Sequence, residues 1–161
     1  MRAKIAGDAG FPVPVAQLWI VRQHEHMEHS TIIKSVRDGM RLEFSNRGSD
    51  FFQVSASNSD IHVAARVSSF EPRPSSMPGF FRDLAVHWQG WQGKKEWASL
   101  EGELTFTATS DSTGHTSLAV KLRPNLYPCS WTLLVTLVLE AGQLEQVATD
   151  IEKFFSHECA A

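Results

Sequence analysis

The chain has 161 residues, enough for one domain that buries about two-thirds of the surface its unfolded form exposes. Hydrophobic residues make up 42% and charged residues 20%, which excludes a disordered composition. Lys and Arg number 15 against 18 Asp and Glu, and the formal net charge of -3 excludes a basic nucleic-acid-binding protein.

The residues that bear on the cellular compartment predict a soluble cytoplasmic protein. Cys129 and Cys159 form no C-x-x-C pair, so we expect reduced thiols without a zinc cage or a redox motif. Pro12 and Pro14 interrupt the N-terminal apolar stretch, which does not fit a secretory signal. The longest apolar segment elsewhere, Trp131 to Leu139, is too short to cross a membrane.

The N-terminal part of the chain differs in pattern from the rest. Residues 1–30 show no sustained apolar period and are predicted to form a poorly patterned arm. Met27 stands shortly before the first predicted strand and is an alternative translation start. Residues 31–157 are predicted to fold as a single α+β domain.

Four strands are predicted in the first part of this domain, because apolar residues alternate with polar ones between short turns. They cover Ile32 to Val36, Met40 to Phe44, Phe51 to Ser57 and Ile61 to Val67. We expect an antiparallel meander that ends at the proline-containing segment from Ser69 to Ser76.

A helix is predicted from Met77 to Gln89, because its apolar residues recur at three- and four-residue steps. These residues are Phe80, Phe81, Leu84, Ala85 and Trp88. We expect Phe81, Leu84 and Trp88 to pack in the core. The following segment, Trp91 to Leu100, is predicted to be an aromatic connector.

The second part of the domain contains the clearest predicted hairpin. Its strands alternate from Glu103 to Thr109 and again up to Leu122, around a turn from Asp111 to Gly114. The segment from Trp131 to Leu139 carries apolar residues on both faces, which predicts a central strand covered on both sides. An amphipathic helix is predicted from Gly142 to Ser156. The expected fold is therefore α+β, a curved antiparallel sheet of about seven strands with two amphipathic helices packed on it.

The run from His24 to His29 contains imidazole and carboxylate groups of the kind that bind zinc or nickel. No helix or strand is predicted there, so nothing orients these groups as ligands. We expect a solvated arm, no functional metal site and no cofactor.

His115 follows Gly114 at the start of a strand, where it is suited to act as an acid or base near neutral pH. The local sequence places no carboxylate or nucleophile beside it, so we interpret it as a structural histidine that caps the turn beginning at Asp111. The chain also lacks G-x-S-x-G, H-E-x-x-H, a phosphate-binding glycine loop and a dinucleotide fingerprint. We therefore predict no catalytic residues and no enzyme; a small-molecule or metal-dependent enzyme using His115 is the first alternative.

Aromatic and acidic residues are candidates for a binding surface. Trp91 and Trp97 flank charged residues and suit a binding surface as well as a core. Glu101 and Glu103 are expected on the solvent side of the strand that carries Leu104. After Trp97, eight acidic residues stand against three basic ones, so this part of the chain suits a basic partner.

Several short motifs lie in the predicted helices, the connector and the turns. They are Phe80-Phe81-Arg82-Asp83-Leu84, Trp88-Gln89-Gly90-Trp91, Trp97-Ala98-Ser99-Leu100-Glu101-Gly102, Gly114-His115, and Gln143-Leu144 with Phe154-Phe155. This set resembles a family of short bacterial proteins of unknown function and spans residues 31–155. The order of elements is more distantly similar to WapI-type immunity proteins, which neutralise toxins of contact-dependent competition systems. That resemblance implies a stoichiometric inhibitor of a toxin.

We therefore expect a non-enzymatic protein-binding domain, monomeric or homodimeric, that acts by occlusion, most concretely as an immunity-like inhibitor of a basic toxin domain. No nucleic-acid or membrane partner is expected. The predicted partner-binding residues are Trp91, Trp97, Glu101, Glu103, Glu145 and Glu152. A second alternative is a self-associating structural module that dimerises through an edge strand.

Overall fold

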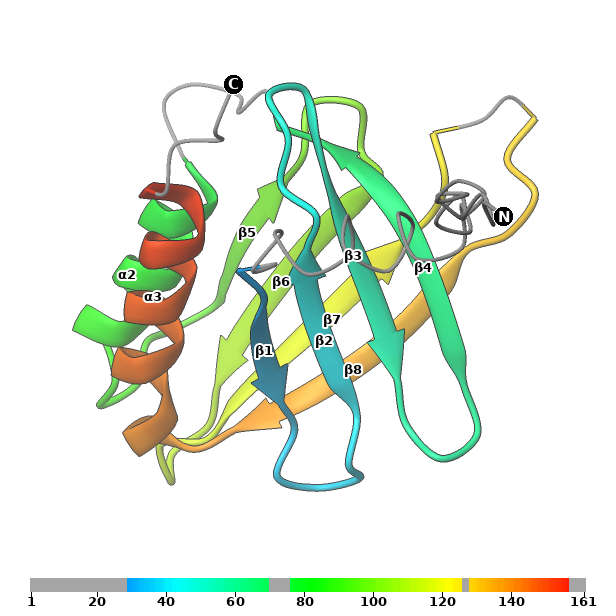
Figure 1. The fold of residues 1–161 in the computed structure, drawn as a ribbon. Helices are drawn as coiled ribbons and strands as arrows, with labels where there is room; N and C mark the ends of the chain where they lie inside the picture. The colour runs from blue at the N-terminus through cyan, green and yellow to red at the C-terminus, as the bar shows by residue number, and fades with distance from the viewer. Residues whose placement is uncertain (1–28, 70–75, 126–127, 157–161) are drawn as a thin grey trace, which may run out of the picture.

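A computed structural model describes residues 29–69, 76–125 and 128–156 (Figure 1). Four strands and a helix follow one another twice along the chain. The first half contains β1 (Thr31–Lys34), β2 (Arg41–Ser45), β3 (Phe51–Ser57), β4 (His62–Ser68) and α2 (Met77–Val86). The second half contains β5 (Lys94–Ala98), β6 (Leu104–Ser110), β7 (Thr116–Leu122), β8 (Leu133–Leu139) and α3 (Ala141–Ser156). The histidine run up to Glu28 and the alternative start at Met27 lie outside the described residues.

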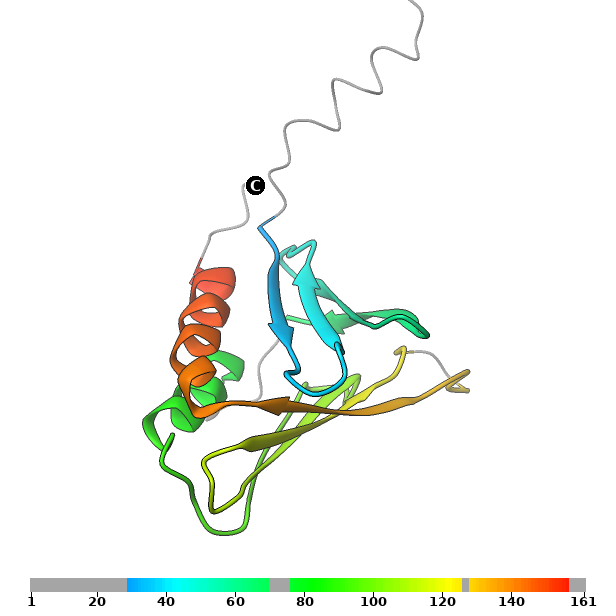
Figure 2. The ribbon, with the colours of Figure 1, turned by 90° about the horizontal axis from the view of Figure 1, so that it is seen from below.

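The eight strands form two four-stranded antiparallel sheets, with the orders β1-β2-β3-β4 and β5-β6-β7-β8. The α+β class with two helices is confirmed, but the prediction of one curved sheet of about seven strands is wrong. Figure 2 shows the sheets as two layers, with both helices along one end. No helix in the described part of the chain is long and apolar enough to span a membrane.

The strand that the sequence analysis missed is β5, which lies inside the predicted aromatic connector. It pairs with β6 in register, and Trp97 lies opposite Phe106. Trp97 is the only fully buried residue of this strand, since Lys94 to Glu96 carry charged side chains. A single buried residue produces no visible alternation, which is why the pattern resembled a connector.

Helix α3, at the end of the second half, packs on the sheet of the first half. The ring of Phe154 lies 6.2 Å from that of Phe44 on β2 and 6.2 Å from that of Phe52 on β3. Phe155 also meets Phe52, with ring centroids 5.3 Å apart.

Helix α2, at the end of the first half, packs on the sheet of the second half. Phe106 on β6 is the centre of this contact, with ring centroids 5.8 Å from Phe80 and 5.3 Å from Phe81. Trp97 stacks on the same ring at 5.6 Å. Each helix therefore covers the sheet formed by the other half, so neither half encloses a core of its own.

The two sheets also join along a first seam, between the end of β1 and β8. The loop after β1 is closed by Ser35, whose amide donates to the carbonyl of Met40 at 2.9 Å. The amide of Val36 donates to the carbonyl of Val138 at 2.9 Å. The amide of Val138 in turn donates to Ser35 Oγ at 3.2 Å.

A second seam joins the loop after β5 to the end of β4. Here the amide of Ser99 donates to the carbonyl of Leu104 at 2.9 Å, which repeats the bond made by Ser35. The carboxylate of Glu103 accepts from the amide of Ser68 at 3.2 Å and from Ser99 Oγ at 2.6 Å. The two halves thus share one loop geometry and differ in the group that reaches across.

Glu103 was predicted on the solvent side of its strand, and this is wrong because its exposed fraction is 0%. Gly102 adopts a φ of 68°, so the chain turns immediately before β6 and Glu103 does not follow the alternation of that strand. A buried carboxylate requires hydrogen-bond donors, and the seam supplies a backbone amide and a hydroxyl.

Strand β8 was predicted to be central and covered on both sides, but it is an edge of its sheet. Leu137 and Leu139 are buried in the core, whereas Leu134 on the opposite face is 73% exposed. Apolar residues on both faces of this strand therefore do not reflect burial on both faces.

Candidate functional site

Among the residues that the structure describes, the most exposed Phe or Trp side chain lies just after α2. The helix ends at Val86 and not at Gln89, because the amide of Gly90 bonds to the carbonyl of His87 at 2.8 Å and closes a turn. Trp88 was predicted in the core, and this is wrong because it is 53% exposed. Val86, two residues earlier in the chain, is 67% exposed. Two apolar side chains at the end of α2 are thus open to solvent.

The loop that carries Trp88, residues 87–93, is fixed against two other segments. A Cβ atom added to Gly90 would lie 3.2 Å from Ser110 Oγ, and Gly90 has a φ of 111°. A Cβ atom added to Gly114 would lie 3.9 Å from the carbonyl oxygen of Trp88 and 3.7 Å from Ala141 Cβ. The loop, the β6–β7 turn and the start of α3 therefore meet around Trp88.

A group of charged side chains fixes the same loop from the other side. Lys95 on β5 forms an ion pair with Asp83 on α2. His87 Nδ1 lies 3.1 Å from Asp83 Oδ1 and 3.0 Å from Lys95 Nζ. Lys95 Nζ also lies 5.1 Å from the ring centroid of Trp91. Because His87 and Asp83 are about half exposed, this group is better suited to holding the loop than to acid–base catalysis.

The two tryptophans that were predicted to bind a partner differ in burial. Trp97 is 5% exposed and belongs to the core under α2. Trp91 is partly buried against the core, and its Nε1 atom is buried without a hydrogen-bond partner among the described residues. A partner that docks on this surface would meet Trp91 at its edge, whereas Trp97 lies beneath the surface.

The predicted acidic residues fall into separate places. On α3, Glu145 and Glu152 both bind Arg82 of α2, at 2.6 Å and 2.7 Å. The hydrogen bonds from Arg82 lower the pKa of Glu152. Glu101 is exposed and Glu103 is buried, and both lie beyond the other end of β5 from Trp91. The structure therefore does not bring the six predicted residues together, and Arg82 partly neutralises the acidic face.

His115 belongs to the hydrogen bonds of the β6–β7 turn, as the sequence analysis interpreted it. The expectation that no carboxylate lies beside it is wrong, because Asp111 Oδ2 lies 3.6 Å from its Nδ1 atom. Its amide donates to Asp111 Oδ1 at 3.0 Å, and its Nδ1 atom lies 2.6 Å from Thr113 Oγ1. The Thr113 hydroxyl and amide donate to the same carboxylate, which lowers the pKa of Asp111. The imidazole is about half exposed. Because all of these bonds lie within the turn, they stabilise the turn that contacts the Trp88 backbone.

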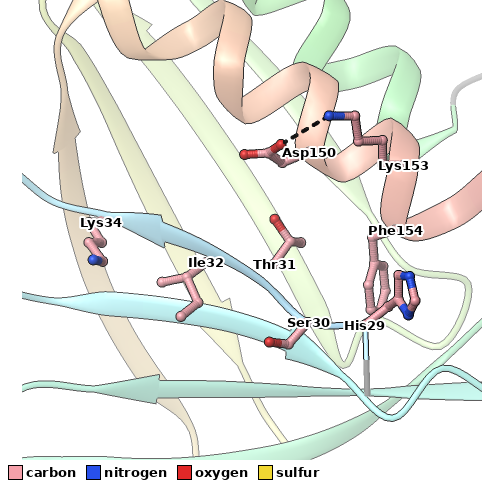
Figure 3. Close-up of a pocket in the computed structure, with 8 residues that line it drawn as sticks. All are labelled: His29, Ser30, Thr31, Ile32, Lys34, Asp150, Lys153 and Phe154. Carbon is pink, nitrogen blue, oxygen red and sulfur yellow. Dashed lines mark ion pairs between the residues drawn. The ribbon is translucent and has the colours of Figure 1, made fainter. Parts of the chain in front are cut away.

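A groove of about 440 Å³ runs between β1 and α3 (Figure 3). Thr31 on β1 and Phe154 on α3 line it, together with charged residues of both signs. Asp150 and Lys153 on α3 form an ion pair of 4.0 Å across its rim. Among the described residues, no three His, Cys, Asp or Glu side chains cluster in a way that could hold a metal ion.

Comparisons with known proteins identify a family and no activity. No curated protein matches the chain. A solved structure titled "Crystal structures of trypanosoma bruciei MRP1/MRP2" is similar over 91% of this chain and 95% of that chain, with 13% identity and a TM-score of 0.44. The resemblance to WapI-type immunity proteins stays a prediction. Residues 28–158 match the model of a family of unknown function, DUF6228, and the chain therefore belongs to that family.

Proposed function

We propose that this protein is a non-enzymatic protein-binding domain whose docking surface is centred on Trp88. The observation that carries the proposal is the exposure of Trp88 and Val86 at the end of α2. Tryptophan is enriched at the centres of protein–protein interfaces, where it supplies a large apolar area. Exposed apolar side chains gain free energy when a partner covers them.

The rigidity of the surface supports the same proposal. Gly90 and Gly114 bring the loop within contact of the β6–β7 turn. His87 of the loop contacts Lys95 on β5, and the Asp83–Lys95 ion pair joins α2 to the same strand. An aromatic side chain on a fixed backbone loses little conformational freedom when a partner binds. Trp88 therefore suits a binding role better than an aromatic residue on a free loop would.

The charges around Trp88 favour a partner with basic groups. Asp111 lies in the turn that contacts the loop, and Glu140 precedes Ala141 at the start of α3. Both are exposed acidic residues on segments that meet this loop. Charge complementarity of this kind speeds association and sets orientation. An immunity-like inhibitor of a basic toxin domain is the most concrete form of this proposal.

The proposal is tested by affinity purification from the native host with the full chain, its Trp88→Ala variant and a control variant, Leu100→Ala. Leu100 is also an exposed apolar residue, but it lies beyond the other end of β5. We expect one protein at equal stoichiometry with the wild type and with Leu100→Ala, and its loss with Trp88→Ala. With purified components, Trp88→Ala should weaken binding by about 2 kcal/mol, or roughly 30-fold.

Two results would contradict the proposal. One is the absence of any stoichiometric protein from the wild-type purification, and the other is a partner that Trp88→Ala retains at full affinity. The free energy of unfolding should change by less than about 0.5 kcal/mol in Trp88→Ala, because the side chain is exposed. Unfolding measurements on the variant therefore separate a binding defect from a folding defect.

A further inference from the structure

Strands β4 and β8 occupy corresponding edges of the two sheets. On β4, the amide of Ser68 points away from β3, since it donates to Glu103 across the second seam. On β8, the amide and carbonyl of Val138 point away from β7, toward Ser35 and Val36. Because backbone direction alternates along a strand, every second residue before Ser68 and Val138 also directs its amide and carbonyl outward.

The outward residues differ sharply between the two edges. On β4 they include Ala64 and Arg66, and the guanidinium of Arg66 lies over the ring of Phe51 at 4.5 Å. The corresponding residues of β8, counted back from Val138, are Leu134 and Thr136. No charged residue and no proline occurs from Trp131 to Leu139.

The edge of β8 is open over its middle. Among the described residues, no hydrogen bond from outside the β7–β8 pair reaches the backbone of Leu134 or Thr136. Natural sheet edges are commonly protected by a charge, a proline or a covering segment, because open edges pair with other strands. Arg66 gives β4 such a charge, whereas β8 presents an uncharged edge and the 73% exposed side chain of Leu134.

We propose that the edge of β8 pairs antiparallel with β8 of a second copy of this chain, around a twofold axis. The β5–β8 sheet of one copy and the β5–β8 sheet of the other then form one continuous eight-stranded sheet across the dimer. The free outward residues set the register, with Leu134 of each copy opposite Thr136 of the other. Val138 takes no part in the pairing, because the first seam already engages its backbone.

A second copy fits this edge because the strand is compatible with itself. An uncharged strand meets no like charge when it pairs with an identical strand. The neighbouring residues on β7 are Lys121 beside Leu134 and Ala119 beside Thr136. In the proposed register, each Lys121 therefore faces the Ala119 side of the other copy, and the two lysines stay apart.

The mass of the full chain in solution tests the proposal. Sedimentation equilibrium over a wide concentration range should show a monomer–dimer equilibrium for the wild type. Thr136→Arg gives β8 the charge that β4 carries at the corresponding position, and it should yield a monomer at all concentrations. Ala64→Arg, the matched control on β4, should leave the dimer unchanged.

Hydrogen exchange gives a second measurement of the same pairing. The amides of Leu134 and Thr136 should exchange more slowly as the concentration of the wild type rises, while that of Ala64 should not change. If Thr136→Arg is poorly folded by circular dichroism, Leu134→Lys replaces it, since that side chain is exposed. A wild type that stays monomeric at its highest soluble concentration would overturn the proposal, as would a dimer that both variants retain.

Discussion

The two seams between the halves of this chain have the same geometry and different chemistry. In both, a serine amide closes the loop after the first strand, and the serine side chain takes part in the contact with the last strand of the other half. The first seam uses Ser35 and backbone groups alone, whereas the second inserts the carboxylate of Glu103. A repeated architecture therefore fixes where a contact is made and leaves open which chemical group makes it.

The largest expected effect comes from the aromatic contacts that bind each helix to the other half. Phe106→Ala should lower the free energy of unfolding by about 3 to 5 kcal/mol, because it removes the ring that Phe80, Phe81 and Trp97 contact. Phe52→Ala is the matched change on the first sheet, where Phe154 and Phe155 lose their contact. Urea unfolding should show similar losses for the two variants.

The same measurements test whether the halves unfold together. Circular dichroism reports on both sheets. Tryptophan fluorescence reports mainly on the second half and on the loop that leads to it, because Trp88, Trp91, Trp97 and Trp131 lie there and β1 to β4 contain no tryptophan. We expect coincident transitions in the wild type and in both variants. Two separated transitions would show that each half is stable without the helix of the other.

An intermediate effect is expected at the second seam. Glu103→Ala leaves the amide of Ser68 and the hydroxyl of Ser99 without the carboxylate that they bind, in a buried place. We expect a loss of about 2 to 4 kcal/mol in the free energy of unfolding, against about 1 kcal/mol for Ser35→Ala at the first seam. Glu101→Ala, an exposed neighbour, serves as the control and should change little. Equal losses at the two seams would remove the distinction drawn between them.

The smallest effect concerns the pair of helices and depends on pH. Arg82 lowers the pKa of Glu152 below its ordinary value of 4.5. A carboxyl group with a lowered pKa in the folded state stabilises the protein above its ordinary pKa, and this contribution is lost as the pH falls through the lowered value. Arg82→Gln should therefore reduce stability near neutral pH and make it less sensitive to acid.

Thermal unfolding of wild type and Arg82→Gln measures this difference in stability. The range from about pH 7 to about pH 3 covers the titration of carboxyl groups. The difference between wild type and Arg82→Gln should shrink toward low pH. Asp111 has a lowered pKa in both proteins, because it is bonded to Thr113, and it should leave a shared acid sensitivity. A difference that stays constant over the whole range would show that Arg82 acts through packing and not through charge.

Much of the fold follows from local patterns in the sequence. The alternation around Leu42, Phe44 and Phe106 predicted the hairpins, and the periodic apolar residues predicted both helices close to their observed ranges. These features depend on the period of buried side chains within one element, which the sequence records directly. The split into two sheets does not follow from local patterns, because strand order is set by contacts between distant segments.

The errors share this cause. Strand β5 buries one residue only, and the apolar residues of β8 do not reveal which of its faces is covered. The helical period continues through Trp88, although the turn at Gly90 has already ended the helix. Glu103 could not be placed, since its burial depends on Ser68 in the other half. The surface that we propose centres on Trp88, whereas the sequence analysis predicted partner-binding residues on the neighbouring segment, at Trp91 and Trp97.

The exchange of helices between the halves has a consequence for how this chain reaches its native state. Each sheet is covered by the helix of the opposite half. The arrangement resembles a domain-swapped dimer, except that both halves belong to one polypeptide. A ribosome that has released only the first half has supplied a sheet without its cover. Synthesis must therefore run to α3 before the sheet of the first half can be covered, whereas α2 is already present when the sheet of the second half forms.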